Sequence, residues 1–211
     1  MSITRFIVVR HGETAWNAQR RIQGHLDSPL NEEGLAQALL IAERLSSEPF
    51  DHFYVSDLGR ARQTAQPLAD RTGREPIVTA RLRERCLGVF QGLTGPECGQ
   101  RYPDDYRRFH SREPDHAMPG AESTRALYDR VSTQFEAWAT EHPDTRVLAI
   151  THGGVLDVLY RHVNGLPLEA ARDYPLFNAS LNSVRREEAA WVLEDWGDIA
   201  HLTRDAARDD F

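Results

Sequence analysis

The chain has 211 residues, 40% of them hydrophobic and 27% charged, and carries a net charge of −7. This composition is typical of one globular domain, and the acidic balance argues against a general binder of nucleic acid or of anionic membranes. All 25 basic residues are arginine, which excludes mechanisms that need a lysine amine, such as Schiff-base chemistry, the P-loop and the protein-kinase site.

The cysteine content and the N-terminal segment narrow the class of protein. Cys86 and Cys98 are too few for a disulfide framework or for a zinc site of four thiolates. The apolar run at residues 6–9 is far shorter than a signal peptide or a membrane span. We therefore expect a cytoplasmic protein that is not embedded in a membrane.

Short apolar runs alternate with helical patterns along the chain. Residues 6–9 are β-branched and apolar without alternation, which predicts a strand buried on both faces of a parallel sheet. Asn31 is a candidate N-cap, and the helix after it has apolar residues at helical spacing (Leu35, Ala38, Leu39, Ala42 and Leu45). Further strands are predicted at 52–56, 77–80, 147–151, 181–186 and 191–196. Further helices are predicted from near Arg60, with Ser56 or Asp57 as cap, from Ser123, and over 155–163.

Residues 85–122 differ from the rest of the chain because they are rich in Gly, Pro, Arg and acidic residues. They predict a partly helical excursion from the sheet that serves as a lid. Its aromatic residues and histidines are expected mainly to pack the lid (Tyr102, Tyr106, Phe109, His110 and His116, with Met118).

The order of elements predicts an α/β fold with a single domain over residues 1–211. We expect a three-layer α/β/α sandwich with a mainly parallel central sheet and a small lid insertion at about 85–122. The tail after Thr203 is expected to fray.

Two of the strongest strand runs end in the same way, at His11-Gly12 and at His152-Gly153. Ligand sites in open α/β sheets lie outside the carboxyl ends of the strands, so these two histidines can face each other although 141 positions separate them. A glycine after each histidine lets a ligand approach the backbone.

Arginines accompany these histidines. Arg10 precedes the first histidine, and Arg60 stands at a predicted helix start, where backbone amides already favour an anion. A forked guanidinium suits a phosphoryl group. Glu84 follows the third predicted strand and supplies a carboxylate, whereas His25, in a loop, is expected to be solvated.

Five motifs in order resemble the histidine phosphatase superfamily, also called phosphoglycerate mutase-like. The first comprises Arg10-His11-Gly12-Glu13-Thr14, Trp16-Asn17, Gln23-Gly24 and Asp27-Ser28-Pro29-Leu30. The others are Ser56-Asp57-Leu58 with Arg60-Ala61 and Gln63-Thr64-Ala65, then Leu82-Arg83-Glu84, Gly120-Ala121-Glu122-Ser123, and Thr151-His152-Gly153-Gly154. The resemblance covers about residues 5–185.

The resemblance implies a role for each matching residue. His11 is expected to be the nucleophile that forms a phosphohistidine, and Glu84 the general acid and then the general base. Arg10, Arg60 and His152 are expected to hold the phosphoryl oxygens, with Asn17 helping. Gln23, Gly24 and Gly153 are the remaining substrate-binding candidates. An imidazole with a pKa near ~6.5 is substantially neutral at pH 7 and can attack through one nitrogen.

The surroundings of this site favour a phosphatase over a mutase. Cofactor-dependent phosphoglycerate mutases of this family carry a long basic insertion after the catalytic glutamate, and a Thr or Ser where this chain has Gln23. Here the segment after Glu84 is modest in length and close to charge-balanced. A mutase stays the alternative, with Arg107 and Arg108 as candidates to bind a second carboxylate or phosphate.

Two lesser alternatives are a phosphoprotein phosphatase and a non-catalytic binder of phosphorylated ligands. The expected partner is a small phosphorylated metabolite, with neither nucleic acid nor membrane, and a homodimer is left open. No cofactor and no metal are expected, because no carboxylates cluster to hold an ion.

Overall fold

The computed structural model describes residues 2–202, so the prediction for the tail after Thr203 lies outside the described residues. Within that range six strands form one sheet in the order β3-β2-β4-β1-β5-β6. Their bounds are Ile3–Arg10 (β1), His52–Ser56 (β2), Ile77–Thr79 (β3), Arg146–Thr151 (β4), Leu181–Glu187 (β5) and Ala190–Asp198 (β6). The four strands β1, β2, β3 and β4 are parallel to one another, whereas β5 pairs antiparallel with β1 and β6 pairs antiparallel with β5 at one edge of the sheet. Each predicted strand is confirmed, with ends that differ from the predicted ones by at most three residues.

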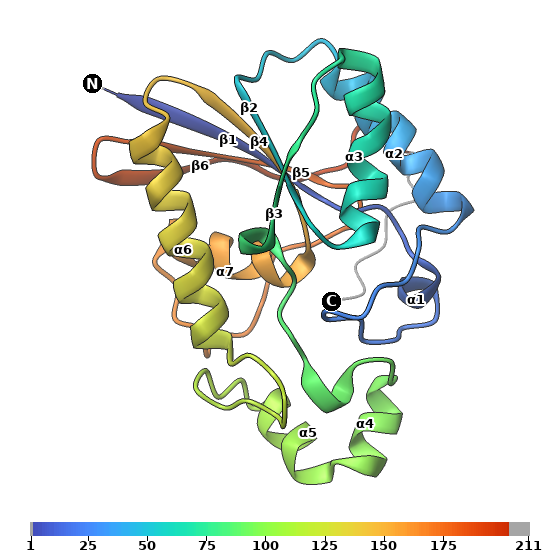
Figure 1. Cartoon of the computed structure of the whole chain (residues 1–211). Helices are drawn as coiled ribbons and strands as arrows, with labels where there is room; N and C mark the ends of the chain where they lie inside the picture. The colour runs from blue at the N-terminus through green and yellow to red at the C-terminus, as the bar shows by residue number, and fades with distance from the viewer. Residues whose placement is uncertain (1, 203–211) are drawn as a thin grey trace.

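Helices cover both faces of the sheet. The long ones are α2 (Glu32–Leu45), α3 (Gly59–Thr72), α6 (Thr124–Glu141) and α7 (Gly153–Asn164), and the short ones are α1 (Ala15–Ala18), α4 (Gly95–Arg101) and α5 (Pro103–His110). α2 and α3 lie on one face, and α6 and α7 lie on the other (Figure 1). The three-layer α/β/α sandwich with a mainly parallel sheet is therefore confirmed. None of the helices in residues 2–202 is long and apolar enough to cross a membrane.

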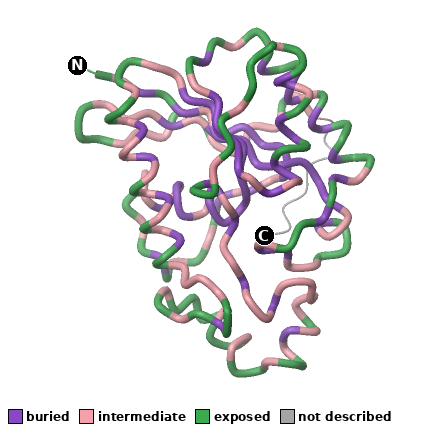
Figure 2. The backbone as a smooth tube through the Cα atoms, in the orientation of Figure 1, coloured by how far each residue is buried: buried purple, intermediate pink, exposed green. Residues whose placement is uncertain are grey.

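The two layers of the core use alternate residues of the same strands. In β1, Phe6 and Val8 pack toward α6 and α7, whereas Val9 packs toward α2 and α3. Phe6 meets Phe135 of α6 with ring centroids 5.2 Å apart. The buried residues therefore concentrate along the strands at the centre of the molecule (Figure 2). This packing fixes the strand ends, from which the candidate site residues project.

The buried face of α2 differs from the predicted one. Leu35 and Leu39 are 50% and 61% exposed, whereas Ile41, with Ala38, Ala42 and Leu45, is buried. The helix is rotated because Gln37 Oε1 accepts a hydrogen bond of 2.8 Å from the amide of Glu13. That bond draws the Gln37 and Ile41 side of the helix inward.

The cap of α3 is also not the predicted one. Leu58 is the N-cap residue and makes no side-chain cap. The Asp27 carboxylate, from a distant loop, accepts hydrogen bonds from the amides of Gly59 and Arg60. Ser56 instead bonds to His152, and Asp57 pairs with Arg83 at 2.7 Å.

The segment after Glu84 carries α4 and α5, which lie apart from the sheet (Figure 1). It has its own cluster of buried residues (Leu87, Phe90, Cys98 and Met118). His110 packs edge-on against Tyr106, with ring centroids 4.3 Å apart, and His116 lies 3.2 Å from Asp105. We call this segment, residues 85–122, the lid; its opening and closing stay a prediction.

Candidate active site

The two histidines meet at the carboxyl ends of neighbouring strands. β1 and β4 pair in a register that places Arg10 opposite Thr151, so the residues that follow are adjacent. The His11 amide donates to the Thr151 carbonyl at 2.9 Å, and the centroids of the His11 and His152 rings lie 5.2 Å apart. The prediction that these two rings face each other is confirmed.

The hydrogen bonds of His11 define its tautomer. Nδ1 lies 2.8 Å from the carbonyl oxygen of Gly12, and since that oxygen only accepts, Nδ1 carries the proton. Nε2 therefore has a lone pair and accepts from Nε of Arg60 at 3.3 Å. Burial, together with the charges of Arg60 and Arg10, lowers the pKa of His11 well below 6.5. His11 is thus held neutral with Nε2 available as a nucleophile.

Arg60 is fixed by the loop that precedes α2. Its side chain is 1% exposed and donates to the carbonyls of Gly24, at 2.8 Å, and Leu26, at 3.2 Å, and to Asp27 Oδ1 at 3.2 Å. Arg10 is likewise buried and donates to the carbonyl oxygen of Leu176. Two oriented guanidinium groups thus flank His11.

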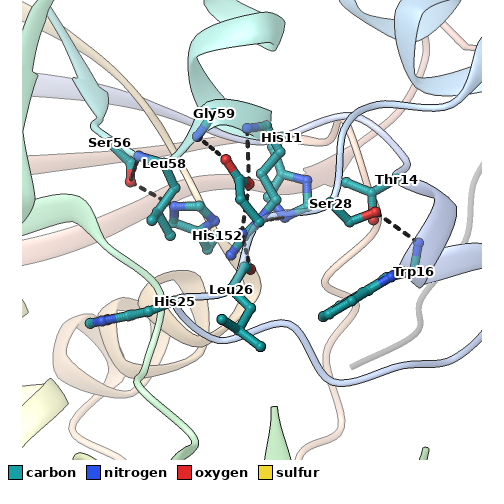
Figure 3. A network of polar contacts seen from close by, with 12 residues as sticks. His11, Thr14, Trp16, His25, Leu26, Ser28, Ser56, Leu58, Gly59 and His152 are labelled. Atoms are coloured by element: carbon teal, nitrogen blue, oxygen red, sulfur yellow. Dashed lines mark hydrogen bonds and ion pairs between the residues drawn. The ribbon is translucent and has the colours of Figure 1, made fainter. Parts of the chain in front are cut away.

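His152 lies behind His11 and is completely buried. Its Nε2 is 2.8 Å from the hydroxyl of Ser56, at the end of β2 (Figure 3). Burial and the nearby charges of Arg60, His11 and Arg10 lower its pKa well below 6.5. His152 and Gly153 do not line the cavity described below.

Glu84 comes from the segment after β3 and is 5% exposed. Its Oε1 accepts from the amide of Arg85 at 2.7 Å, and its Oε2 accepts from the amide of Gly154 at 3.0 Å. A Cβ at position 154 would lie 2.2 Å from Glu84 Oε1, so this close approach requires glycine. The carbonyl of Glu84 lies 2.8 Å from Nε2 of His25, which is therefore half-buried and positioned rather than solvated as expected.

A cavity of about 190 Å³ opens beside these groups. Of the predicted site residues it is lined by Arg10, His11, Asn17, Gln23, Gly24, Arg60 and Glu84. Asn17 is held by a capping box with Thr14, and Gly24 adopts φ +55°, a conformation that favours glycine. The sequence therefore locates most of the walls of one cavity.

The same cavity has walls that the motifs did not indicate, namely Arg20, Arg21, Ile22 and Leu87, together with Phe109 of the lid. Arg21 donates to Glu97 at 3.0 Å and thereby ties the loop to α4. For Arg20 and Arg21 the sequence signal was the arginine-rich loop after His11, which indicates charge but not where the side chains point.

The arrangement can bind a phosphoryl group and accept it on nitrogen. Two guanidinium groups supply charge-assisted donors, neutral His11 supplies a lone pair, and Glu84 supplies a carboxylate for proton transfer. Within residues 2–202, no group of three or more His, Cys, Asp or Glu side chains is arranged to hold a metal ion.

Comparison with known proteins gives the family. A phosphoglycerate mutase-like protein of Arabidopsis thaliana is 43% identical over 93% of this chain and 86% of its own length. A metal-independent phosphoserine phosphatase of the same plant is 41% identical over 95% of this chain and 84% of its own. The structure of a mycobacterial glucosyl-3-phosphoglycerate phosphatase with VO3 matches with a TM-score of 0.79 and 33% identity, covering 92% of this chain and 98% of that one. Because the model of the histidine phosphatase superfamily (branch 1) matches residues 6–199, the chain belongs to that superfamily.

Proposed function

We propose that this protein is a phosphatase that hydrolyses small phosphomonoesters through a phosphohistidine formed at Nε2 of His11. The observation that carries the proposal is the bond from Nδ1 of His11 to the carbonyl of Gly12, at 2.8 Å. It fixes the proton on Nδ1 and leaves Nε2 unprotonated between two arginines. The lowered pKa of His11 keeps that nitrogen nucleophilic at neutral pH.

In the first step the Nε2 lone pair of His11 attacks phosphorus, and the bond from phosphorus to the ester oxygen breaks. Arg10 and Arg60 donate to the equatorial oxygens, where charge develops in the transition state. Glu84 gives a proton to the leaving oxygen, which departs as the alcohol. His152 provides a further donor when its Nδ1 carries the proton of the neutral ring.

In the second step water attacks the phosphohistidine. Glu84, now a carboxylate, takes a proton from that water, and the bond between phosphorus and Nε2 breaks. Inorganic phosphate leaves, and the lone pair returns to His11. No metal takes part, which is supported by the similarity to the metal-independent phosphoserine phosphatase of Arabidopsis thaliana.

Hydrolysis rather than mutase chemistry is supported by the lid. Arg107 and Arg108, the candidates for a mutase's second anion site, pair with Asp104 at 3.0 Å and with Glu113 at 2.8 Å. Neither arginine lines the cavity beside His11. The mutase remains the second candidate because the relative that is 43% identical is named as phosphoglycerate mutase-like.

A phosphorus NMR time course with 3-phosphoglycerate, with and without 2,3-bisphosphoglycerate, tests the proposal. We expect release of inorganic phosphate without any requirement for the bisphosphate, and loss of that release in His11→Ala. A 2-phosphoglycerate signal that depends on the bisphosphate and grows faster than free phosphate would assign the chain to the mutases instead.

A further inference from the structure

The peptide group between Gly12 and Glu13 lies between the candidate nucleophile and helix α2. Its carbonyl oxygen accepts a hydrogen bond of 2.8 Å from Nδ1 of His11. Its N–H points the opposite way, as in any trans peptide, and donates to Oε1 of Gln37 at 2.8 Å. A continuous chain of hydrogen bonds therefore runs from the ring of His11, through one peptide group, to the side chain of Gln37.

Gln37 is a polar residue on the inward side of α2, where its neighbours Ala38 and Ile41 are apolar. Its side chain is 0% exposed. Because a backbone N–H only donates, the atom of Gln37 that faces Glu13 is the carbonyl oxygen Oε1. Nε2 of Gln37 lies 3.5 Å from Oε1 of Glu33, one turn earlier, which agrees with this orientation of the amide. A buried amide is costly without a hydrogen-bond partner, so the bond between Gln37 and Glu13 matters to both groups.

The backbone around this peptide group is held by close packing as well. A Cβ at Gly12 would lie 2.6 Å from the carbonyl oxygen of Gly34 in α2, and a Cβ at Gly34 would lie 1.9 Å from that of Glu13. The N–H of Gly12 donates to the hydroxyl of Thr64 in α3 at 3.0 Å. Packing and Thr64 thus fix where the loop lies, whereas the bond from Gln37 fixes which way the next peptide group points.

We propose that Gln37 is a positioning residue for the nucleophile, which holds the Gly12 carbonyl toward Nδ1 of His11 and so selects the tautomer with a lone pair on Nε2. The inference rests on the proposed phosphatase function, in which Nε2 attacks phosphorus. A hydrogen bond to the N–H of a peptide polarises its carbonyl and strengthens the bond that this carbonyl accepts. The other tautomer places the proton on Nε2 and blocks attack. The same bond stabilises the phosphohistidine, because the ring gains positive charge when Nε2 bonds to phosphorus.

Nitrogen-15 NMR of the histidine-labelled protein at pH 7.5 tests the tautomer without any substrate. The signals of His11 are assigned by their loss in His11→Gln. We expect a protonated Nδ1 and an unprotonated Nε2 in wild type and in Gln37→Glu, which keeps an oxygen acceptor, and a mixture of both tautomers in Gln37→Leu. Gln63→Leu is the matched control: it removes an acceptor of the same kind, bonded to the amide of Leu30 at 2.9 Å, and should keep the wild-type signals.

Steady-state kinetics on an aryl phosphate give the second readout. Gln37→Leu should lower kcat by about 3- to 10-fold, the rate equivalent of one lost hydrogen bond, with KM nearly unchanged, and Gln37→Glu should restore most of the loss. Thermal unfolding checks that each variant is folded. If Gln37→Leu does not fold, Gln37→Asn, which withdraws the acceptor by one methylene group, takes its place with the same expected results.

A folded Gln37→Leu or Gln37→Asn variant in which His11 keeps the wild-type tautomer would overturn the inference, whatever its kcat. The same holds if Gln63→Leu changes the tautomer as much as Gln37→Leu does. If wild type releases no phosphate from the aryl ester, the proposed phosphatase function fails instead, and the NMR signals alone decide the role of Gln37.

Discussion

The hydroxyl oxygen of Ser56 lies 2.8 Å from Nε2 of His152, and Nδ1 of that buried ring has no hydrogen-bond partner within residues 2–202. The lowered pKa of His152 keeps the ring neutral, with one N–H. When the Ser56 hydroxyl donates to Nε2, that N–H lies on Nδ1, which can donate to a phosphoryl oxygen beside His11. We therefore predict that Ser56 is a positioning residue, which selects this tautomer of His152.

Ser56→Ala should lower kcat by on the order of 10²-fold, the loss typical of one transition-state donor, and leave KM nearly unchanged. Ser56→Thr keeps the hydroxyl and should retain most of the activity. The two variants are compared by steady-state kinetics on an aryl phosphate, with thermal unfolding measured alongside. An Ala variant with wild-type kcat, or one that raises KM alone, would contradict the tautomer role.

The carboxyl-end site was predictable because parallel strands bring their ends to one edge wherever they lie in the chain. The apolar runs of β1 and β4, each followed by His-Gly, therefore predict from the sequence that His11 and His152 lie at this edge. Arg10 and Arg60 follow from those same strand and helix boundaries, since one ends β1 and the other begins α3. For these four residues the strand or helix end seen in the sequence is also the place where the fold puts the side chain.

The sequence could not predict contacts made by residues far apart in the chain. The carboxylate of Asp27 caps α3, and no local sequence signal links Asp27 to Gly59. The residues next to the helix start whose side chains could cap it are Ser56 and Asp57, and the sequence therefore indicated those two. The rotation of α2 likewise depends on one bond between Gln37 and the amide of Glu13.

Asp27 should contribute to both stability and substrate binding, since it caps α3 and holds Arg60. Asp27→Ala should reduce the free energy of unfolding by about 0.5–2 kcal/mol, the range for loss of a side chain that caps a helix N-terminus. It should also raise KM for a phosphate ester, because Arg60 loses one of the acceptors that orient it. Urea denaturation and steady-state kinetics provide the two measurements.

Asp57→Ala is the matched control, since Asp57 makes a salt bridge with Arg83 and does not cap the helix. A partly exposed ion pair contributes only about 0–1 kcal/mol. A larger loss of stability in Asp57→Ala than in Asp27→Ala would return the cap to the residue that the sequence indicated.

Glu84→Gln should affect esters according to how much their leaving oxygen needs a proton. Loss of general acid catalysis should lower kcat/KM for an alkyl phosphate by about 10²–10⁴-fold. Nitrophenyl phosphate should lose far less, because its leaving oxygen departs without a proton. Rates measured over a series of leaving groups should depend more steeply on the leaving-group pKa in Glu84→Gln than in wild type. Equal losses of kcat/KM across the series would show that another residue is the general acid.

Acid should destabilise the fold through its two buried histidines. The pKa values of His11 and His152 are lowered in the folded protein, whereas the unfolded chain keeps them near ~6.5. Below that pH the unfolded state binds more protons, so stability is fully present above pH ~6.5 and is lost as the pH falls toward the folded pKa values. Each histidine contributes up to ~1.4 kcal/mol per pH unit to the slope of the unfolding free energy against pH.

Urea unfolding between pH 7.5 and 5.0 should show a smaller slope of the unfolding free energy against pH in His11→Gln and in His152→Gln than in wild type. His110→Gln, which removes an exposed lid histidine, should keep the wild-type slope. Slopes that are the same in wild type and in all three variants would show that neither buried ring is held neutral by the fold.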